Sequence, residues 1–209
     1  IRKNLGIEKE AQASDKRTIG IATLMTDVRQ SFAAPLSQEK LFEWHQMIVA
    51  GHRRIQPGQW RTHAEPMEVI SGPVGDETVH FEAPPSSIVP REMARFISWF
   101  NDTSPDGSTP IKKAVVRSAV AHLYFESIHP FEDGNGRIGR ALSEKALSQS
   151  LGRPALLSLS QAIEAKRNDY YDALQQAQQT NEITPWITWF VAIALEAQVQ
   201  AEEHFDFTL

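Results

Sequence analysis

Residues 129–140 read His-Pro-Phe-Glu-Asp-Gly-Asn-Gly-Arg-Ile-Gly-Arg, and this run is the most informative stretch of the chain. Pro130 disfavours a helical conformation at the residue before it, so the preceding helix is expected to end at His129. Asp133-Gly134-Asn135-Gly136 has the composition of a turn. The run is therefore expected to join two helices, one over 115–128 and one over 135–149.

The second half of the run has the features of an anion site. A helix that starts near Asn135 presents free backbone N–H groups, and the neighbouring glycines allow a ligand to approach them closely. The Asn135 side chain is also expected to cap this helix. Arg137 and Arg140 are three residues apart and so share a helix face. Two arginines at such a site indicate a polyphosphate rather than a single carboxylate.

This run matches the signature of the Fic (filamentation induced by cAMP) family, His-x-Phe-x-(Asp/Glu)-Gly-Asn-Gly-Arg-x-x-Arg, at every defined position. The resemblance covers roughly Leu36 to Phe190, but only the run itself is specific. It implies an all-α fold, a Fic-type helical bundle with one small β-hairpin flap. It also implies a protein adenylyltransferase, which transfers AMP from ATP to a Ser, Thr or Tyr hydroxyl of a target protein.

Two residues of the run are expected to carry the chemistry. His129 is the candidate catalytic base, because a neutral imidazole can take a proton from an attacking hydroxyl near pH 7. Asp133 is the candidate Mg²⁺ ligand, because this cation favours carboxylate and phosphate oxygens. The alternatives are a structural histidine and an Asx-turn residue that only shapes the loop.

The other residues that the resemblance assigns are expected to hold ATP. A backbone cradle receives the phosphates, two arginines bind the β and γ phosphates, and a second family-like segment, Tyr170 to Gln175, lies near the adenine. The nucleotide-binding residues are thus Gly134, Asn135, Gly136, Arg137, Arg140, Tyr171 and Gln178. Related proteins often carry Asn at the position of Gln178.

Several neighbours of these residues are expected to be structural. His122 and Phe131 are assigned to the core, Glu132 to the solvent, and Trp186 and Trp189 to the core rather than to a ligand. None of these five residues is therefore expected to bind the nucleotide or take part in the reaction.

Residues 67–84 predict two short strands around a loop, with Gly72-Pro73 as the turn. This segment resembles the family's flap, which aligns the target by strand addition. The alternative is an ordinary surface hairpin.

In the rest of the chain, the spacing of apolar residues and the start and stop signals predict helices. Two helices are expected early in the chain, one over 19–32 and one from the N-cap Ser37 to near Gly51. Three more are expected later, one after Pro90, one continuous helix from Ser160 through Leu174, and one from Pro185 onward. Gly152 is expected to end the helix over 135–149. Residues 1–10 are read as a helix end that stops near Gly6. The chain is divided into a lead-in over 1–35, truncated upstream, and a Fic domain over 36–209.

The composition sets the broad class. The 209 residues are 41% hydrophobic and 22% charged, with a net charge of −5 and no cysteine. A net negative charge argues against a nucleic-acid surface. No apolar run is long enough for a membrane span, and the absence of cysteine is compatible with a cytoplasmic protein.

Two questions remain open at this level. The same fold could remove AMP, transfer another phosphate-linked group, or act as a non-catalytic nucleotide-sensing module that binds other proteins; kinase-type relatives carry Lys in place of Gly136.

Many relatives are also inhibited by a helix with (Ser/Thr)-x-x-x-Glu-(Gly/Asn), whose Glu pairs with the arginine that corresponds to Arg140. No match occurs here, the nearest being Ser160 to Ala165. An inhibitory helix is therefore expected upstream of this chain or on an antitoxin-like partner.

Overall fold

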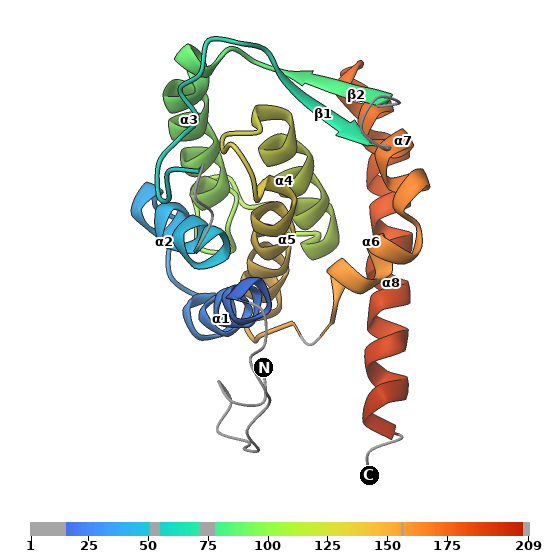
Figure 1. The fold of residues 1–209 in the computed structure, drawn as a ribbon. Helices are drawn as coiled ribbons and strands as arrows, with labels where there is room; N and C mark the ends of the chain where they lie inside the picture. Colours follow the sequence, from blue (N-terminus) through green and yellow to red (C-terminus); the bar gives the residue numbers. More distant parts are fainter. Residues whose placement is uncertain (1–15, 51–54, 72–77, 156, 207–209) are drawn as a thin grey trace.

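The computed structural model describes residues 16–50, 55–71, 78–155 and 157–206, and Figure 1 shows its fold. The described residues form eight α-helices and one antiparallel sheet of two strands. The all-α class with one small hairpin is therefore confirmed. Residues 1–10, which were expected to end a helix, lie outside the described residues, as does the predicted turn at Gly72-Pro73.

The helices and strands follow the chain in a simple order. The helices are α1 (Lys16–Ser31), α2 (Gln38–Val49), α3 (Val89–Asp102), α4 (Ala114–Ile128), α5 (Asn135–Leu151), α6 (Leu159–Ala165), α7 (Arg167–Gln178) and α8 (Thr184–Asp206). The strands are β1 (Met67–Ser71) and β2 (Thr78–Ala83).

Helices α4 and α5 form the centre of the molecule, with α1 to α3 on one side and α6 to α8 on the other (Figure 1). One hydrophobic cluster joins α1, α2 and α3 to the central pair and includes Leu24, Trp44, Phe96 and Phe125. A second cluster lies against the other side of the pair and is centred on Trp186. The predicted boundary between a lead-in and a Fic domain stays a prediction.

Local signals in the sequence account for several helix ends. The Ser37 side chain accepts a hydrogen bond from the Lys40 N–H (3.2 Å), as an N-cap does. Gly152 ends α5 in the left-handed conformation (φ 66°), which glycine adopts without steric cost. Both ends were predicted, and they fix where α2 begins and where α5 stops.

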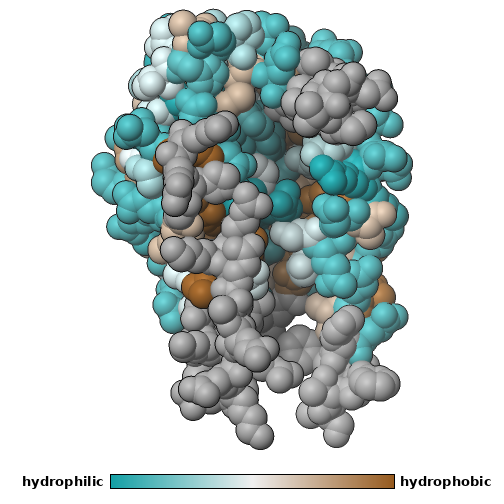
Figure 2. Space-filling model, in the orientation of Figure 1, coloured by the Kyte–Doolittle hydropathy of each residue, from teal (hydrophilic) through white to brown (hydrophobic). Residues whose placement is uncertain are grey.

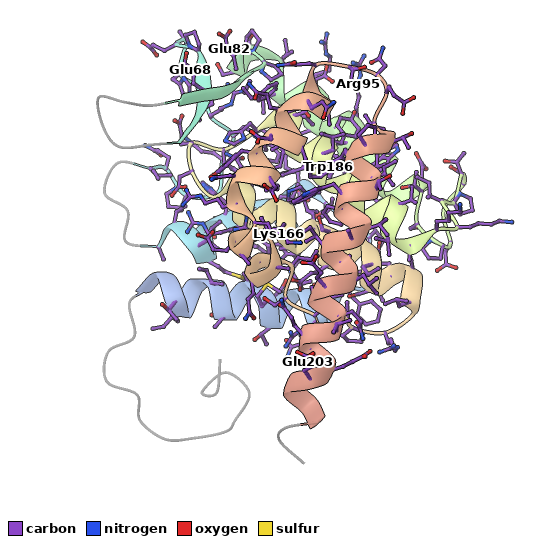
Figure 3. All side chains as sticks on the ribbon, turned by 90° about the vertical axis from the view of Figure 1, so that its right-hand side faces the viewer. Glu68, Glu82, Arg95, Lys166, Trp186 and Glu203 are labelled. Carbon is purple, nitrogen blue, oxygen red and sulfur yellow. The ribbon has the colours of Figure 1, made fainter. Side chains whose placement is uncertain are left out.

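The single helix expected from Ser160 through Leu174 is wrong, because the structure divides it into α6 and α7. The chain leaves the helical conformation at Lys166 (φ −126°, ψ 42°), and the cap of α6 is Ser158 rather than Ser160. The Lys166 ammonium forms an ion pair with Glu196 of α8, which holds the break against that helix. Figure 3 labels Lys166 at this junction.

The hairpin lies over one end of the bundle and reaches α7 (Figure 1). The pairing runs from Met67 opposite Ala83 to Ser71 opposite Thr78, with one irregularity that leaves an extra residue in β2. Glu68 and Glu82 lie directly opposite each other and are both exposed (Figure 3). The strands predicted within 67–84 are confirmed.

The face of the molecule drawn in Figure 2 is mostly polar. On the face drawn in Figure 2, hydrophobic residues appear as small separate spots between hydrophilic ones. Among the described helices, α8 included, none combines the length and the apolar character needed to cross a bilayer.

Candidate active site

The candidate site begins where α4 ends. His129 follows the last helical residue and has a left-handed backbone (φ 49°, ψ 60°), while its N–H still donates to the Phe125 carbonyl (3.0 Å). Within the described part of the chain, His129 is the one non-glycine residue with positive φ. A conformation of this kind costs on the order of 1–3 kcal/mol and persists only where the surroundings enforce it.

The loop after His129 is anchored in the core. Phe131 is fully buried, stacks on His45 (centroids 4.1 Å apart) and lies 5.0 Å from the Trp60 ring. The Asn135 amide accepts from the Phe131 N–H (2.9 Å) and donates to the Phe131 carbonyl (2.8 Å). Phe131 is therefore the core anchor that was expected. Asn135, however, closes the loop instead of capping α5, so the capping role expected for it is wrong.

Helix α5 starts without a side-chain cap. The N-cap residue is Gly134 (φ 93°), and a Cβ there would lie 2.5 Å from the Ile48 Cδ1 atom, so only glycine fits. By helix geometry, the N–H groups of 135–137 have no intrahelical acceptor. They and the helix dipole make an electropositive cradle at this end of α5.

Asp133 lies at the edge of this cradle. Its Oδ1 accepts from the Gly134 N–H (2.6 Å), and its Oδ2 is 2.8 Å from Nη2 of Arg137. The side chain is 44% exposed. No group of three or more potential metal ligands of the His, Cys, Asp and Glu types occurs among the described residues. A cation at Asp133 would therefore need further oxygens from a bound ligand, which is how Mg²⁺ usually binds nucleotide phosphates.

The two arginines contact different neighbours. Arg137 donates from Nη1 to the Ile48 carbonyl of α2 (3.1 Å), whereas Arg140 donates from Nε to the Ser160 hydroxyl of α6 (3.0 Å). Both arginines lie in the first two turns of α5. Both guanidinium groups nevertheless lie beside the glycines at the start of α5, since a Cβ at Gly134 would be 3.6 Å from Nη2 of Arg137 and a Cβ at Gly136 would be 3.1 Å from Nη1 of Arg140.

Glu126 is a site residue that the sequence analysis missed. It is 4% exposed, and its Oε2 lies 3.6 Å from Nδ1 of His129, the residue that follows α4. Burial raises the pKa of Glu126, but attraction to His129, His122 and Arg140 outweighs it and holds the pKa below the ordinary value. Gly139 makes room for the carboxylate, since a Cβ there would lie 2.3 Å from Oε1. The i, i+3 spacing with His129 was the available signal.

Two other histidines are poor candidates for a base. Burial lowers the pKa of His45 to about 4 and also lowers the pKa of the fully buried His122. Both nitrogens of His122 are engaged, by the Ser143 hydroxyl (3.2 Å) and the Tyr170 hydroxyl (3.0 Å). His122 is therefore the core histidine that was expected. His129, whose side chain is 15% exposed, is accessible from the loop.

Helix α7 carries the two residues expected near the adenine. Gln178 donates from Nε2 to the Ser127 hydroxyl (3.4 Å) beside the end of α4, and its buried Oε1 atom has no hydrogen-bond partner. Tyr171 lies two turns earlier, with its ring 5.3 Å from the Tyr170 ring. The amide oxygen of Gln178 is therefore available to accept a hydrogen bond at this end of α7.

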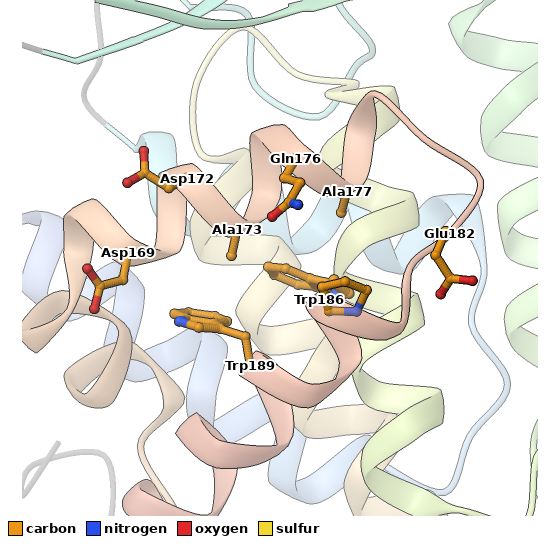
Figure 4. Close-up of a pocket in the computed structure, with 9 residues that line it drawn as sticks. Asp169, Asp172, Ala173, Gln176, Ala177, Glu182, Trp186 and Trp189 are labelled. Carbon is orange, nitrogen blue, oxygen red and sulfur yellow. The ribbon is translucent and has the colours of Figure 1, made fainter.

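A pocket of about 330 Å³ lies elsewhere, between α7 and the start of α8. Figure 4 shows Asp169, Asp172 and Glu182 around it, with Trp186 and Trp189 below. No residue of the run 129–140 lines this pocket. Trp186 is 1% exposed and donates to the Ala119 carbonyl (2.9 Å), so it is a core residue as expected.

Glu132 and Glu164 lie outside the cradle. Glu132 is exposed, as expected, and its Oε2 is 3.4 Å from Nε2 of His63. Glu164, the acid in the nearest match to the inhibitory pattern, lies 3.9 Å from Arg167 instead of pairing with Arg140.

Comparisons with known proteins point to one family. The model of the Fic/DOC family matches residues 35–147. The chain is 31% identical over 155 residues to Protein adenylyltransferase Fic of Nematostella vectensis, covering 74% of this chain and 33% of that protein. It is 28% identical over 168 residues to Protein adenylyltransferase fic-1 of Caenorhabditis briggsae, covering 79% and 28%. The chain thus spans about a third of the length of these relatives.

Solved structures share the fold. A Fic family protein from Desulfovibrio desulfuricans G20 superposes with a TM-score of 0.71 at 24% identity, over 93% of this chain and 56% of that chain. Fic-1 of C. elegans (residues 134–508) superposes with a TM-score of 0.68 at 18% identity, over all of this chain and 58% of that chain. The arrangement of α4, the loop and α5 is therefore set in a fold that has already been observed.

Proposed function

Because the chain belongs to the Fic/DOC family, we propose that it is a protein adenylyltransferase that transfers AMP from ATP to a Ser, Thr or Tyr hydroxyl of a target protein. One arrangement carries the proposal. A partly exposed histidine lies on the same short loop as an uncapped, glycine-rich helix start, so a proton acceptor lies next to an anion cradle. The names of the curated relatives support the same reaction.

In this reaction His129 takes the proton from the target hydroxyl. The hydroxyl oxygen forms a bond to the α-phosphorus of ATP, the bond between that phosphorus and the β-bridging oxygen breaks, and pyrophosphate leaves. The N–H groups at the start of α5, with Arg137 and Arg140, hold the phosphates. Catalysis is mainly positioning and electrostatics, with a contribution of about 10²–10⁴-fold from the base.

Glu126 orients the base. Its Oε2 lies on the Nδ1 side of the His129 ring (3.6 Å), so a proton on Nδ1 is favoured and Nε2 is left free to accept. The buried Oε1 atom of Glu126 has no hydrogen-bond partner, so the carboxylate can accept from the ring after a small rotation.

Asp133 is the residue that would hold Mg²⁺, and the exposed carboxylate fits this role if the nucleotide supplies the remaining oxygens. When bound, the cation would neutralise charge on the phosphates. Arg137 pairs with the Asp133 carboxylate, which places the proposed metal ligand beside a proposed phosphate ligand.

The remaining parts of the proposal concern binding and regulation. Tyr171 and Gln178 line the adenine site, and the hairpin of β1 and β2 is the flap that aligns the target. An inhibitory helix, in cis or from an antitoxin-like partner, would act on Arg140. Cytoplasmic location and the absence of nucleic-acid and membrane partners also remain part of this proposal.

Incubation with a cell lysate and ATP labelled at either the α or the γ phosphate tests the proposed reaction. The proposal predicts label on protein from α-labelled ATP alone. Label from γ-labelled ATP would indicate phosphoryl transfer, and label released from a protein already modified with AMP would indicate the reverse reaction. Nucleotide binding without any labelled protein would favour a nucleotide-sensing module.

A further inference from the structure

We propose that Arg61 is a positioning residue that fixes the backbone of His129 and the base of the flap relative to each other. Its kinetic consequence rests on the proposed transfer of AMP, whereas its structural consequence does not. Arg61 precedes β1 and is separated from the loop by more than sixty residues of sequence.

The Arg61 guanidinium joins three segments of the chain. Nε donates to the His129 carbonyl (2.8 Å), and Nη2 donates to the Ile128 carbonyl (3.4 Å) at the end of α4 and to the Pro84 carbonyl just after β2. The Arg61 N–H donates to the Pro130 carbonyl (2.9 Å). One residue therefore binds consecutive carbonyls on both sides of the strained His129 backbone.

The Arg61 side chain lies in the interior of the protein. It is 2% exposed, and burial lowers its pKa, which Glu132 partly offsets. No carboxylate forms an ion pair with it in the described part of the chain. A buried cation whose acceptors are main-chain carbonyls at a helix C-terminus is stabilised by those carbonyl dipoles. The cost of burying Arg61 is thus offset by contacts that define the His129 conformation.

The base of the flap has a second tie. The Ser86 hydroxyl donates to the His63 carbonyl (2.7 Å), so the chain entering β1 is joined to the chain leaving β2. Arg61 forms a parallel link through Pro84 and continues directly to the His129 carbonyl, whereas His63 reaches the loop only through its ion pair with the exposed Glu132. A movement of the flap base is therefore transmitted to the His129 backbone through Arg61.

Arg117 provides a matched control. It is also a fully buried arginine without an ion pair among the described residues, and burial lowers its pKa to about 10. It donates to the carbonyls of Ala146 (3.0 Å) and Phe100 (2.7 Å) in the bundle. Arg61→Lys and Arg117→Lys each replace a buried, planar guanidinium group by an ammonium group. Of the two arginines, only Arg61 is hydrogen-bonded to the loop after α4.

Hydrogen exchange of the whole chain tests the structural link. In Arg61→Lys, the amides of 128–134 and of both strands should exchange faster together, by about tenfold. In Arg117→Lys these two regions should stay protected, while α3 and α5 near Arg117 become less so. In Ser86→Ala the strands alone should exchange faster. Unchanged exchange of 128–134 in Arg61→Lys, or equal loosening by Arg117→Lys, would overturn the proposal.

Transfer kinetics test the consequence. Arg61→Lys should lower kcat by about 10- to 100-fold and raise KM for the target protein. Ser86→Ala should raise KM for the target without lowering kcat. A kcat of Arg61→Lys equal to that of Arg117→Lys would sink the proposal. If the wild type transfers no AMP, the proposed function fails, and the exchange comparison still decides whether Arg61 links the two segments.

Discussion

At the scale of single residues, His129 depends on contacts that hold an unfavourable backbone. Its carbonyl is bound by Arg61, its N–H by Phe125, and its ring lies beside Glu126. The two hydrogen bonds fix the backbone of His129, and Glu126 limits the orientation of its ring. Positioning of this kind is a main source of catalytic rate, because small displacements of a reacting group are costly.

Glu126→Gln should lower kcat for AMP transfer by about 10- to 100-fold while ATP affinity is retained. The amide can donate to Nδ1 of His129 and so favour the tautomer in which Nε2 already carries a proton. Steady-state kinetics and calorimetry with ATP separate the two effects. Glu132→Gln, which changes an exposed carboxylate on the loop after His129, is the control. A Glu126→Gln enzyme with wild-type kcat would show that the carboxylate does not orient the base.

Asp133→Asn should weaken ATP binding in the presence of Mg²⁺ and leave Mg²⁺-free binding nearly unchanged. The amide conserves the shape of the side chain but lacks the charge that a cation needs. Titration of ATP with and without Mg²⁺ gives the two affinities. Equal losses under both conditions would instead identify Asp133 as a structural turn residue paired with Arg137.

Several features of the candidate site could be predicted because they depend on one short stretch of sequence. The turn, the end of α4 at His129 and the burial of Phe131 all follow from residues 129–140, but the left-handed backbone of His129 was not predicted. Arg61 had no such signal, since its acceptors are main-chain carbonyls contributed by distant segments. The role of Asn135 was predicted wrongly because capping and loop closure use the same side-chain atoms.

At the scale of helices and strands, periodicity located α4, α5 and α8 but could not detect the break between α6 and α7. Lys166 is an ordinary helix-forming residue, and the break is stabilised by its tertiary contact with Glu196. The directions of Arg137 and Arg140 also depended on which helices lie beside α5, which the spacing alone does not give.

The hairpin offers a prediction at this scale. Glu68 and Glu82 face each other across β1 and β2, and like charges in this position are destabilising. Glu82→Lys should therefore stabilise the hairpin by roughly 0.2–1 kcal/mol. Slower hydrogen exchange of the strand amides would record the change, with Glu65→Lys as an exposed control that has no partner strand. Faster exchange in Glu82→Lys would contradict the observed register.

At the scale of the whole molecule, two hydrophobic clusters meet at α4 and α5, and charged residues are buried near that junction. Glu144 is 2% exposed, and burial raises its pKa to about 8, an effect that Arg29 only partly offsets. Its neighbour Lys145 donates to the Ser31 carbonyl (2.7 Å) at the end of α1. Glu144 makes the free energy of unfolding depend on pH.

Between about pH 4.5 and 8, folded Glu144 keeps a proton that the unfolded chain has lost. Raising the pH through this range therefore favours unfolding. Lys145, whose pKa burial lowers to about 8, is charged in both states below that pH and adds no slope. The free energy of unfolding of Glu144→Gln minus that of the wild type should grow from pH 5 to pH 8, to on the order of a few kcal/mol. The exposed Glu164→Gln should give no such trend, and a constant difference for Glu144→Gln would contradict the raised pKa.

The central claim is that His129 acts on the incoming hydroxyl and not on the nucleotide. The most direct measurement compares the wild type with His129→Ala for two quantities under the same conditions, namely ATP affinity by calorimetry and label transferred to protein from α-labelled ATP. We expect the affinity to be retained, because the cradle at the start of α5 is intact, and the transfer to fall by at least about 10²-fold. Transfer by His129→Ala at the wild-type rate, or loss of ATP affinity together with activity, would contradict the account.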